Sequence, residues 1–247
     1  MRILFTVLLS VCLLSFISPG KKKIQIYMAG DSTMQLYDTA KTPQRGWGQV
    51  FHEFFNNDVE IHDMARGGRS TKSFIAEGLW QKLIDNVQKD DWVFIEFGHN
   101  DHDKSKPERF TPPDQYKANL IRMVKDVLAK GAHPVLLTPI ARRSFDKDGN
   151  YHDSHGVYPQ NVFDAAKETG VPVIDLDKQF TGVIVQMGVD SSKSMFMNFG
   201  PGLYTAFPQG HSDDTHLRNA GAEQVASLVA AAIKEQHLSP LAEMLLP

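Results

Sequence analysis

The sequence predicts an α/β fold in three layers, an α/β/α sandwich in which a five-stranded parallel sheet lies between two layers of helices. Two observations lead to this fold class. Five short apolar segments, rich in β-branched and aromatic residues, each precede a stretch that can form a helix. These segments are nearly continuous in their apolar character and do not alternate with polar residues, which is typical of strands covered on both faces.

In chain order, the predicted strands are residues 24–30, 59–65, 92–98, 133–139 and 171–176. The predicted helices are residues 47–55, 71–87, 113–130, 158–169 and 220–236. The third helix has the clearest amphipathic pattern, because Leu120, Met123 and Val127 recur at helical spacing. Gly131 and Gly170 follow the third and fourth helices, where glycine commonly ends a helix before the next strand.

Length and composition indicate one globular domain. The chain has 247 residues, of which 42% are hydrophobic and 22% charged, so it can bury a full core. The formal net charge is −3, and apart from residues 21–23 the lysines are scattered. Nucleic-acid binding or a polybasic membrane contact would require a concentrated positive field, so we expect neither. We expect a monomer.

The first 20 residues have the pattern of a secretory signal peptide. Arg2 precedes an apolar run of about 15 residues, too short for the roughly 20 needed to span a bilayer, and small or turn residues follow up to Gly20. We therefore expect cleavage near Gly20, a single domain over residues 21–247, and a secreted or periplasmic protein. Cys12 is the one cysteine and lies within this run, so the mature chain can form no disulfide.

Residues 24–33, with the sequence IQIYMAGDST, join the first predicted strand to a tight turn. Loops at the carboxyl ends of strands are where ligands bind in open α/β sheets, so Ser32 lies where a nucleophile would be placed. The alternative is that Gly30, Asp31 and Ser32 are turn formers without a chemical role.

Four short motifs lie at element boundaries. They are Gly30-Asp31-Ser32-Thr33, Gly67-Gly68-Arg69-Ser70, Gly98-His99-Asn100-Asp101 and Asp213-Asp214-Thr215-His216. In this order they resemble the four blocks of the SGNH (GDSL-like) hydrolase family, which contribute serine, glycine, asparagine and histidine. The resemblance covers essentially the whole mature chain and implies the flavodoxin-like fold of that family. Finer features, among them Gly46-Trp47-Gly48 and Tyr158-Pro159, look like its rhamnogalacturonan acetylesterase branch.

The same residues form a chemical argument for serine catalysis. A serine hydroxyl is a weak nucleophile and needs a positioned base, which needs an orienting partner in turn. His216 can be the base of Ser32, and Asp213, on the same loop, can fix its tautomer. The order Ser, Asp, His also occurs in α/β-hydrolases, but their G-x-S-x-G motif is absent around Ser32.

Attack on an ester develops negative charge on the carbonyl oxygen, which hydrogen-bond donors stabilise. The amide of Gly68 is a suitable donor because glycine allows close approach, and the following Arg69-Ser70 favours Gly68 over Gly67 in the family pattern. The resemblance implies that the amide of Ser32 and the side chain of Asn100 complete this oxyanion hole.

The remaining acidic and imidazole groups have simpler interpretations. Asp31 and Asp101 are expected to bond backbone amides and not to react. Two runs contain metal-ligand residue types, namely His99-Asn100-Asp101-His102-Asp103 and His152-Asp153-Ser154-His155. Neither has the helical or CxxC-type spacing of common metal sites. We expect no metal and no cofactor.

Several charged and aromatic residues are candidates for substrate recognition. Arg69, His99, Arg142 and Arg143 follow predicted strands and are candidates for substrate binding, since arginine can bind the carboxylate of a uronic acid through two hydrogen bonds. Arg66 and Lys72 lie in the same loops, and such residues are also commonly solvated surface charges. Trp47, Trp80, Tyr204 and Phe207 can stack on sugar rings, although core positions are favoured for the two tryptophans.

The resemblance implies a serine carbohydrate esterase that removes O-acetyl groups from an acetylated pectic polysaccharide or oligosaccharide. Two alternatives remain open at this stage. One is an esterase of the same fold that acts on xylan, a sialic acid or lipid acyl chains, and the other is a sugar-binding protein that has lost catalysis.

Overall fold

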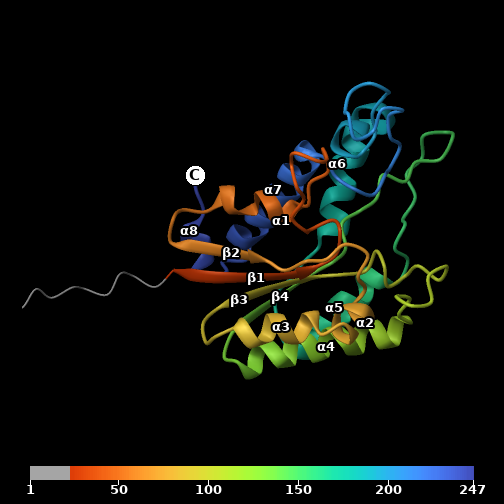
Figure 1. The fold of residues 1–247 in the computed structure, drawn as a ribbon. Coiled ribbons are helices and arrows are strands. Elements are labelled where there is room, and N and C mark those ends of the chain that lie inside the picture. The colour runs from red at the N-terminus through yellow and green to blue at the C-terminus, as the bar shows by residue number, and fades with distance from the viewer. Residues whose placement is uncertain (1–22) are drawn as a thin grey trace, which may run out of the picture.

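A parallel five-stranded sheet forms the centre of the molecule (Figure 1). The computed structural model describes residues 23–247. The strands are β1 (Ile24–Gly30), β2 (Val59–Asp63), β3 (Trp92–Glu96), β4 (His133–Leu137) and β5 (Val173–Ile174). Their order in the sheet is β2-β1-β3-β4-β5, which is the doubly wound order of flavodoxin-like folds. The predicted fold class is confirmed.

The helices cover both faces of the sheet. On one side lie α2 (Thr71–Ala76), α3 (Leu79–Asn86), α4 (Pro113–Ala129) and α5 (Tyr158–Thr169). On the other lie α1 (Trp47–Val50), α6 (Leu176–Ser191), α7 (Asn219–Glu235) and α8 (Leu241–Met244), with short 3-10 helices at Phe51–Phe54 and Ser192–Met195.

Alternate side chains of each strand enter opposite cores. In β1, Ile26 and Met28 pack with α1 and α7, whereas Tyr27 and Ala29 pack with α3 and α4. Both faces of the strand are therefore apolar, and this explains the continuous hydrophobic run in the sequence. Trp47 and Trp80 are both buried in these cores, as the core interpretation predicted.

Some element boundaries differ from the prediction. The segment 71–87 contains two helices and not one, because Gly78 adopts a left-handed conformation with φ 73° between them. Helix α6, which follows β5, was not predicted at all. Asp175 caps α6 by accepting from the amide of Lys178 at 3.1 Å, and Gly188 interrupts the helix with φ 77°. Two internal glycines and a start directly after β5 concealed this helix.

The sheet order brings three predicted motifs together. Strand β1 lies between β2 and β3, so the loops after these three strands meet at one edge of the sheet. Successive strands are added in opposite directions on the two sides of the β1–β3 pair. In such folds ligands bind in the crevice at this switch point. Ser32, Gly68 and Asn100 follow the three strands in turn.

The predicted signal peptide, residues 1–20, lies outside the described residues. Within residues 23–247, no helix combines the length and the apolar character that a membrane span requires.

Candidate active site

Ser32 lies in a tight turn directly after β1. The carboxylate of Asp31 accepts from the amide of Thr33 at 3.0 Å, and the carbonyl of Asp31 accepts from the amides of Met34 and Gln35. The hydroxyl of Tyr37 donates to the carbonyl of Ser32 at 2.8 Å. These bonds fix the turn, so the strand end determines the position of the serine hydroxyl.

The loop before α7 brings His216 to Ser32. The Nε2 atom of His216 lies 2.9 Å from the Oγ of Ser32, although 184 positions separate the two residues. The Nδ1 atom of His216 lies 2.6 Å from Oδ2 of Asp213. Since the carboxylate can only accept, Nδ1 carries the proton, and Nε2 is left to accept the proton of the serine hydroxyl.

Asp213 is held as a carboxylate. Partial burial by itself would raise its pKa, but the hydrogen bond and charge of His216 more than offset this effect and hold the pKa well below the ordinary value. The amides of Thr215 and His216 also donate to Oδ1, at 2.7 and 3.0 Å. Both oxygens are therefore occupied, and the carboxylate cannot rotate away from the imidazole.

Two backbone amides beside the serine have no acceptor. Among residues 23–247, neither the amide of Ser32 nor that of Gly68 donates a hydrogen bond to the protein, and both residues line the same cavity. Gly68 has φ 77°, a left-handed conformation that side-chain-bearing residues rarely adopt. Unpaired amides of this kind can donate to a negatively charged oxygen at the serine.

Asn100 is brought to the same place, but its donors are in use. Its Nδ2 donates to the carboxylate of Asp31 at 3.1 Å and to the carbonyl of Arg69 at 3.0 Å. The side chain therefore ties the Ser32 turn to the Gly68 loop. Direct donation to an oxyanion requires that one of these two hydrogen bonds be shared.

A layer of buried acids lies beneath the serine. Asp31 and Glu96 are both fully enclosed, and the hydroxyl of Thr33 lies between them, 2.9 Å from Asp31 and 3.2 Å from Glu96. Burial, followed by the charge of Asp31, raises the pKa of Glu96 to about 8. Burial likewise raises the pKa of Asp31. Glu96 also accepts from the indole of Trp47 at 2.7 Å, which joins this layer to the core.

Asp101 has the structural position that the sequence predicted. Its carboxylate accepts from the amide of Thr71 at 3.0 Å and from the hydroxyl of Thr71 at 2.6 Å. These bonds attach the loop after β3 to the start of α2. Asp101 therefore positions Asn100 without facing the cavity, which it does not line.

The cavity around Ser32 has a volume of about 650 Å³ and a polar lining. Of the predicted substrate-binding residues, His99 and Arg142 line it, whereas Arg69 and Arg143 do not. Arg69 pairs with Glu77 at 3.0 Å. Arg143 is buried and donates to Asp214 at 2.9 Å, so it holds the loop that carries Asp213.

Sequence reasoning missed several residues that line this cavity. They are Gln35, Tyr37, Gln44, Asp103, Arg109 and Thr215. Arg109 lies in the long loop between β3 and α4, and it pairs with Asp103 at 3.1 Å. Tyr37 and Gln44 lie between β1 and α1, where the sequence carried no motif.

His99 heads a second chain of hydrogen bonds. Its Nδ1 lies 3.1 Å from Nε2 of His155, and Nδ1 of His155 lies 2.9 Å from the carboxylate of Asp177. Burial, followed by the nearby His155, lowers the pKa of His99 well below its ordinary value, so this ring is neutral.

Asp153, His155 and Asp177 can together offer ligand atoms to a metal ion, since one atom of each lies within 4.8 Å of the others. Most of their polar atoms are already bonded within the protein. Asp153 accepts from the amides of His155 and Gly156, and His155 pairs with Asp177.

Comparison with known proteins shows the family of this chain. The model of the GDSL-like lipase/acylhydrolase family matches residues 28–224. The chain belongs to this family. It is also 39% identical over 215 residues to the rhamnogalacturonan acetylesterase RhgT of Bacillus subtilis strain 168, covering 87% of this chain and 91% of that protein. The predicted family is confirmed, and the protein is an ester hydrolase.

Two solved structures share the fold. Protein YxiM of Bacillus subtilis superimposes with a TM-score of 0.76 at 24% identity, covering 88% of this chain and 58% of that longer one. The acetylxylan esterase Axe2 of Geobacillus stearothermophilus superimposes with a TM-score of 0.61 at 16% identity, covering 86% and 94% of the two chains.

Proposed function

We propose that this protein is a secreted serine carbohydrate esterase that removes O-acetyl groups from a pectic polysaccharide. The observation that carries the proposal is the continuous contact from Asp213 through His216 to Ser32 beside two unpaired amides. A positioned base, a fixed tautomer and free donors are the parts that acyl transfer by serine requires.

The first half of the reaction acylates Ser32. Nε2 of His216 takes the hydroxyl proton while Oγ forms a bond to the acetyl carbon, and the carbonyl oxygen becomes negative. The amides of Ser32 and Gly68 donate to this oxygen. As the tetrahedral intermediate collapses, the bond from the acetyl carbon to the sugar oxygen breaks, and His216 returns the proton to that oxygen. The sugar leaves with a free hydroxyl.

The second half releases acetate. A water molecule gives a proton to Nε2 of His216 and attacks the acetyl carbon, and the negative oxygen forms again at the same amides. When the bond to Oγ breaks, His216 returns the proton to Ser32. Asp213 remains ionised throughout and stabilises the positive charge on the imidazole.

A pectic substrate is supported by the cavity and by the relative RhgT. Arg66 and Arg142 line the cavity, and within residues 23–247 no carboxylate pairs with either guanidinium. Free guanidinium groups suit a sugar that carries carboxylates. The polar lining also disfavours a long acyl chain, which binds in apolar pockets.

Xylan is the second candidate substrate. The acetylxylan esterase Axe2 shares the fold, and xylan likewise carries O-acetyl groups on sugar hydroxyls. The unpaired arginines favour the acidic polymer over this neutral one.

Acetate release from a panel of acetylated polysaccharides tests the proposal. We expect release from acetylated pectic polysaccharide at a rate well above that from acetylated xylan, and complete loss of release in Ser32→Ala. Equal or faster release from xylan would contradict the pectic substrate. Release that persists in Ser32→Ala would contradict the acetyl-serine route.

Secretion is proposed from residues 1–20 alone. Expression of the full chain in a bacterial host, with mass spectrometry of the exported protein, is expected to find a mature chain that begins near Lys21. Recovery of only the uncleaved chain in the cytoplasm would contradict it.

A further inference from the structure

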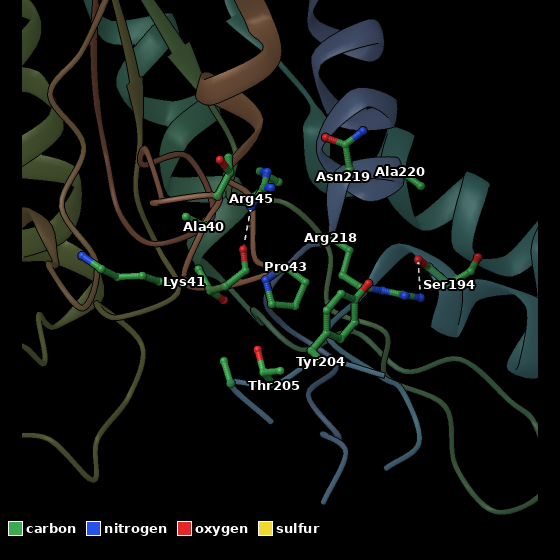
Figure 2. Close-up of a pocket in the computed structure, with 13 residues that line it drawn as sticks. Ala40, Lys41, Pro43, Arg45, Ser194, Tyr204, Thr205, Arg218, Asn219 and Ala220 are labelled. Atoms are coloured by element: carbon green, nitrogen blue, oxygen red, sulfur yellow. Dashed lines mark hydrogen bonds between the residues drawn. The ribbon is translucent and has the colours of Figure 1, made fainter. Parts of the chain in front are cut away.

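A second cavity lies beside the active site and has no part in the reaction described above. Its volume is about 340 Å³, within the range of about 300–1,000 Å³ typical of ligand pockets. One wall comes from the loop between β1 and α1, and the other from the loop before α7 together with the 3-10 helix Ser192–Met195 (Figure 2).

Two segments separate this cavity from the catalytic one. Gln44 lines the catalytic cavity, whereas the next residue, Arg45, lines the second. Likewise His216 faces the first and Arg218 the second. The two segments are joined by an antiparallel bridge between Gln44 and Arg218 and by a hydrogen bond of 2.9 Å from the amide of Arg45 to the carbonyl of Leu217. A polymer that crosses this bridge can occupy both cavities.

The second cavity is positively charged. Arg45, Arg218 and Lys41 line it, and none of its lining residues is acidic. Lys41 pairs with Asp38 at 2.9 Å and in Figure 2 extends away from Tyr204 and Arg218. Within the described part of the chain, neither arginine has a carboxylate partner. In a protein of net charge −3, two unpaired guanidinium groups on one cavity indicate an anionic ligand.

The protein backbone holds both guanidinium groups in place. Arg45 donates through Nη1 to the carbonyls of Thr42 and Gln44, at 2.9 and 2.6 Å. Arg218 donates through Nε to the carbonyl of Phe196 at 2.9 Å and through Nη2 to that of Ser194 at 2.8 Å. Carbonyl oxygens orient a guanidinium without cancelling its charge. Nε and Nη2 of Arg45 and Nη1 of Arg218 have no acceptor among residues 23–247.

An aromatic side chain completes the cavity. Tyr204 lines it and packs edge-to-face on Phe199, with ring centroids 4.7 Å apart. The guanidinium of Arg218 lies over the same Phe199 ring at 5.9 Å. The cavity is also lined by three residues that carry a hydroxyl group, namely Thr39, Thr42 and Thr205. An aromatic ring with surrounding hydroxyls suits a sugar, and the guanidinium groups suit a carboxylate.

We propose that this second cavity is a subsite for a uronic-acid residue of the polysaccharide, bound by Arg45 and Arg218 through its carboxylate and by Tyr204 through its ring. The subsite rests on the proposed function, because it places a neighbouring sugar of the same chain while the acetylated sugar lies at Ser32.

The test compares an acetylated oligogalacturonide with free carboxylates and the same compound with methyl-esterified carboxylates. The readout is the ratio of the two kcat/KM values for acetate release. We expect Arg45→Gln and Arg218→Gln each to lower this ratio about ten-fold, mainly through KM on the acidic compound. Arg122→Gln removes the same charge from α4, on the other side of the sheet, and is expected to leave the ratio unchanged.

Arg218→Lys guards against loss of folding, because Arg218 also bonds two carbonyls of the neighbouring turn. It retains the cation and is expected to keep most of the preference for the acidic compound, with its melting temperature measured alongside. An unchanged ratio in Arg45→Gln and Arg218→Gln overturns the subsite, as does an equal fall in Arg122→Gln.

A binding measurement separates this inference from the proposed function. Calorimetry of Ser32→Ala with an unacetylated oligogalacturonide needs no turnover, and adding Arg218→Gln is expected to weaken binding about ten-fold. Equal binding by the two proteins overturns the subsite and leaves the esterase proposal intact. Loss of acetate release from every polysaccharide, with this binding difference preserved, overturns the proposed function instead.

Discussion

Asp213 and Asp31 both lie near Ser32, but their environments differ. Asp213 is about one-fifth exposed and bonded to His216, whose hydrogen bond and charge hold its pKa low against the effect of burial. Asp31 is fully buried, and burial raises its pKa although Thr33 donates to it twice. The first carboxylate contacts His216, which becomes positive in the proposed reaction, and the second contacts the neutral donors of Thr33 and Asn100.

This difference indicates that the role of each carboxylate depends on the groups to which it is hydrogen-bonded. A carboxylate beside an imidazole stabilises charge that develops during turnover. A carboxylate among amides and hydroxyls instead shapes the loops around it. In this protein Asp31 joins the Ser32 turn to Asn100, and Asp213 alone contacts the base.

The largest expected effect comes from removing His216, which bonds to Asp213 and not to Asp31, or its partner Ser32. His216→Ala and Ser32→Ala should each lower kcat by about 10⁴- to 10⁶-fold, because each removes a participant in proton transfer or bond formation. Steady-state acetate release measures the loss. The melting temperature should stay within about 2 °C of the wild-type value, and unfolding of either variant would show that the residue is structural.

Replacing each of the two acids by its amide tests directly whether their roles differ. Asp213→Asn should lower kcat by about 10²- to 10⁴-fold with little loss of stability, because the amide favours the wrong tautomer of His216. The Asp31→Asn variant should lose less activity but about 1–3 kcal/mol of stability. The new side-chain NH2 group would place a second donor against Nδ2 of Asn100, which now donates to the Asp31 carboxylate. Kinetics and denaturant unfolding of both variants measure these effects, and the reverse order would refute the division of roles.

The pH dependence of stability tests a second buried acid, Glu96, which lies next to Asp31 across the Thr33 hydroxyl. Glu96 has its pKa raised by burial from 4.5 to about 8, so the folded protein retains a proton that the unfolded chain loses within this range. Its contribution to stability is therefore complete below about pH 4.5 and is lost as the pH rises through about 8.

The melting temperature should accordingly fall by several degrees between pH 5.5 and pH 8.5. Glu96→Gln should make this fall shallower but should not abolish it, because burial also raises the pKa of Asp63 and of Asp101 to about 7. Calorimetry across this range is the measurement. A melting temperature that rises with pH in the wild type would contradict the assignment.

The smallest expected effect concerns the cluster that contains Asp177, next to His99 and His155. A chelator should leave kcat/KM unchanged, because Ser32, His216 and two amides supply the groups that the proposed reaction needs. Activity is measured after dialysis against EDTA, with and without added zinc. Loss of activity that zinc restores would overturn this expectation and assign a role to the cluster of Asp153, His155 and Asp177.

Much of the fold could be predicted because strands and amphipathic helices have strong local patterns. Strand β1 and helix α5 begin and end where the sequence predicted. Helix α6 was missed because two glycines interrupt its pattern, and the break at Gly78 was missed because the apolar spacing continues across it. Both errors arise at a glycine in a left-handed conformation, which the spacing of apolar residues does not reveal.

The site was partly predictable for a related reason. Ser32, Gly68, Asn100, Asp213 and His216 lie in short motifs at element boundaries. The strand order brings the first three of these together, and the loop before α7 adds the last two. Glu96 was not predicted because it lies within an apolar strand, and only the structure shows the buried partners around it. Arg45 and Arg218 likewise come from separate loops that no sequence motif connects.

Because the indole of Trp47 donates a hydrogen bond to Glu96, the fluorescence of Trp47 can report whether Glu96 is ionised. Indole emission responds to a nearby charge, so ionisation of Glu96 should change the fluorescence of Trp47 and reveal the electrostatic state of the layer under the nucleophile. The chain has three tryptophans, and replacing Trp80 and Trp92 by phenylalanine would isolate this signal.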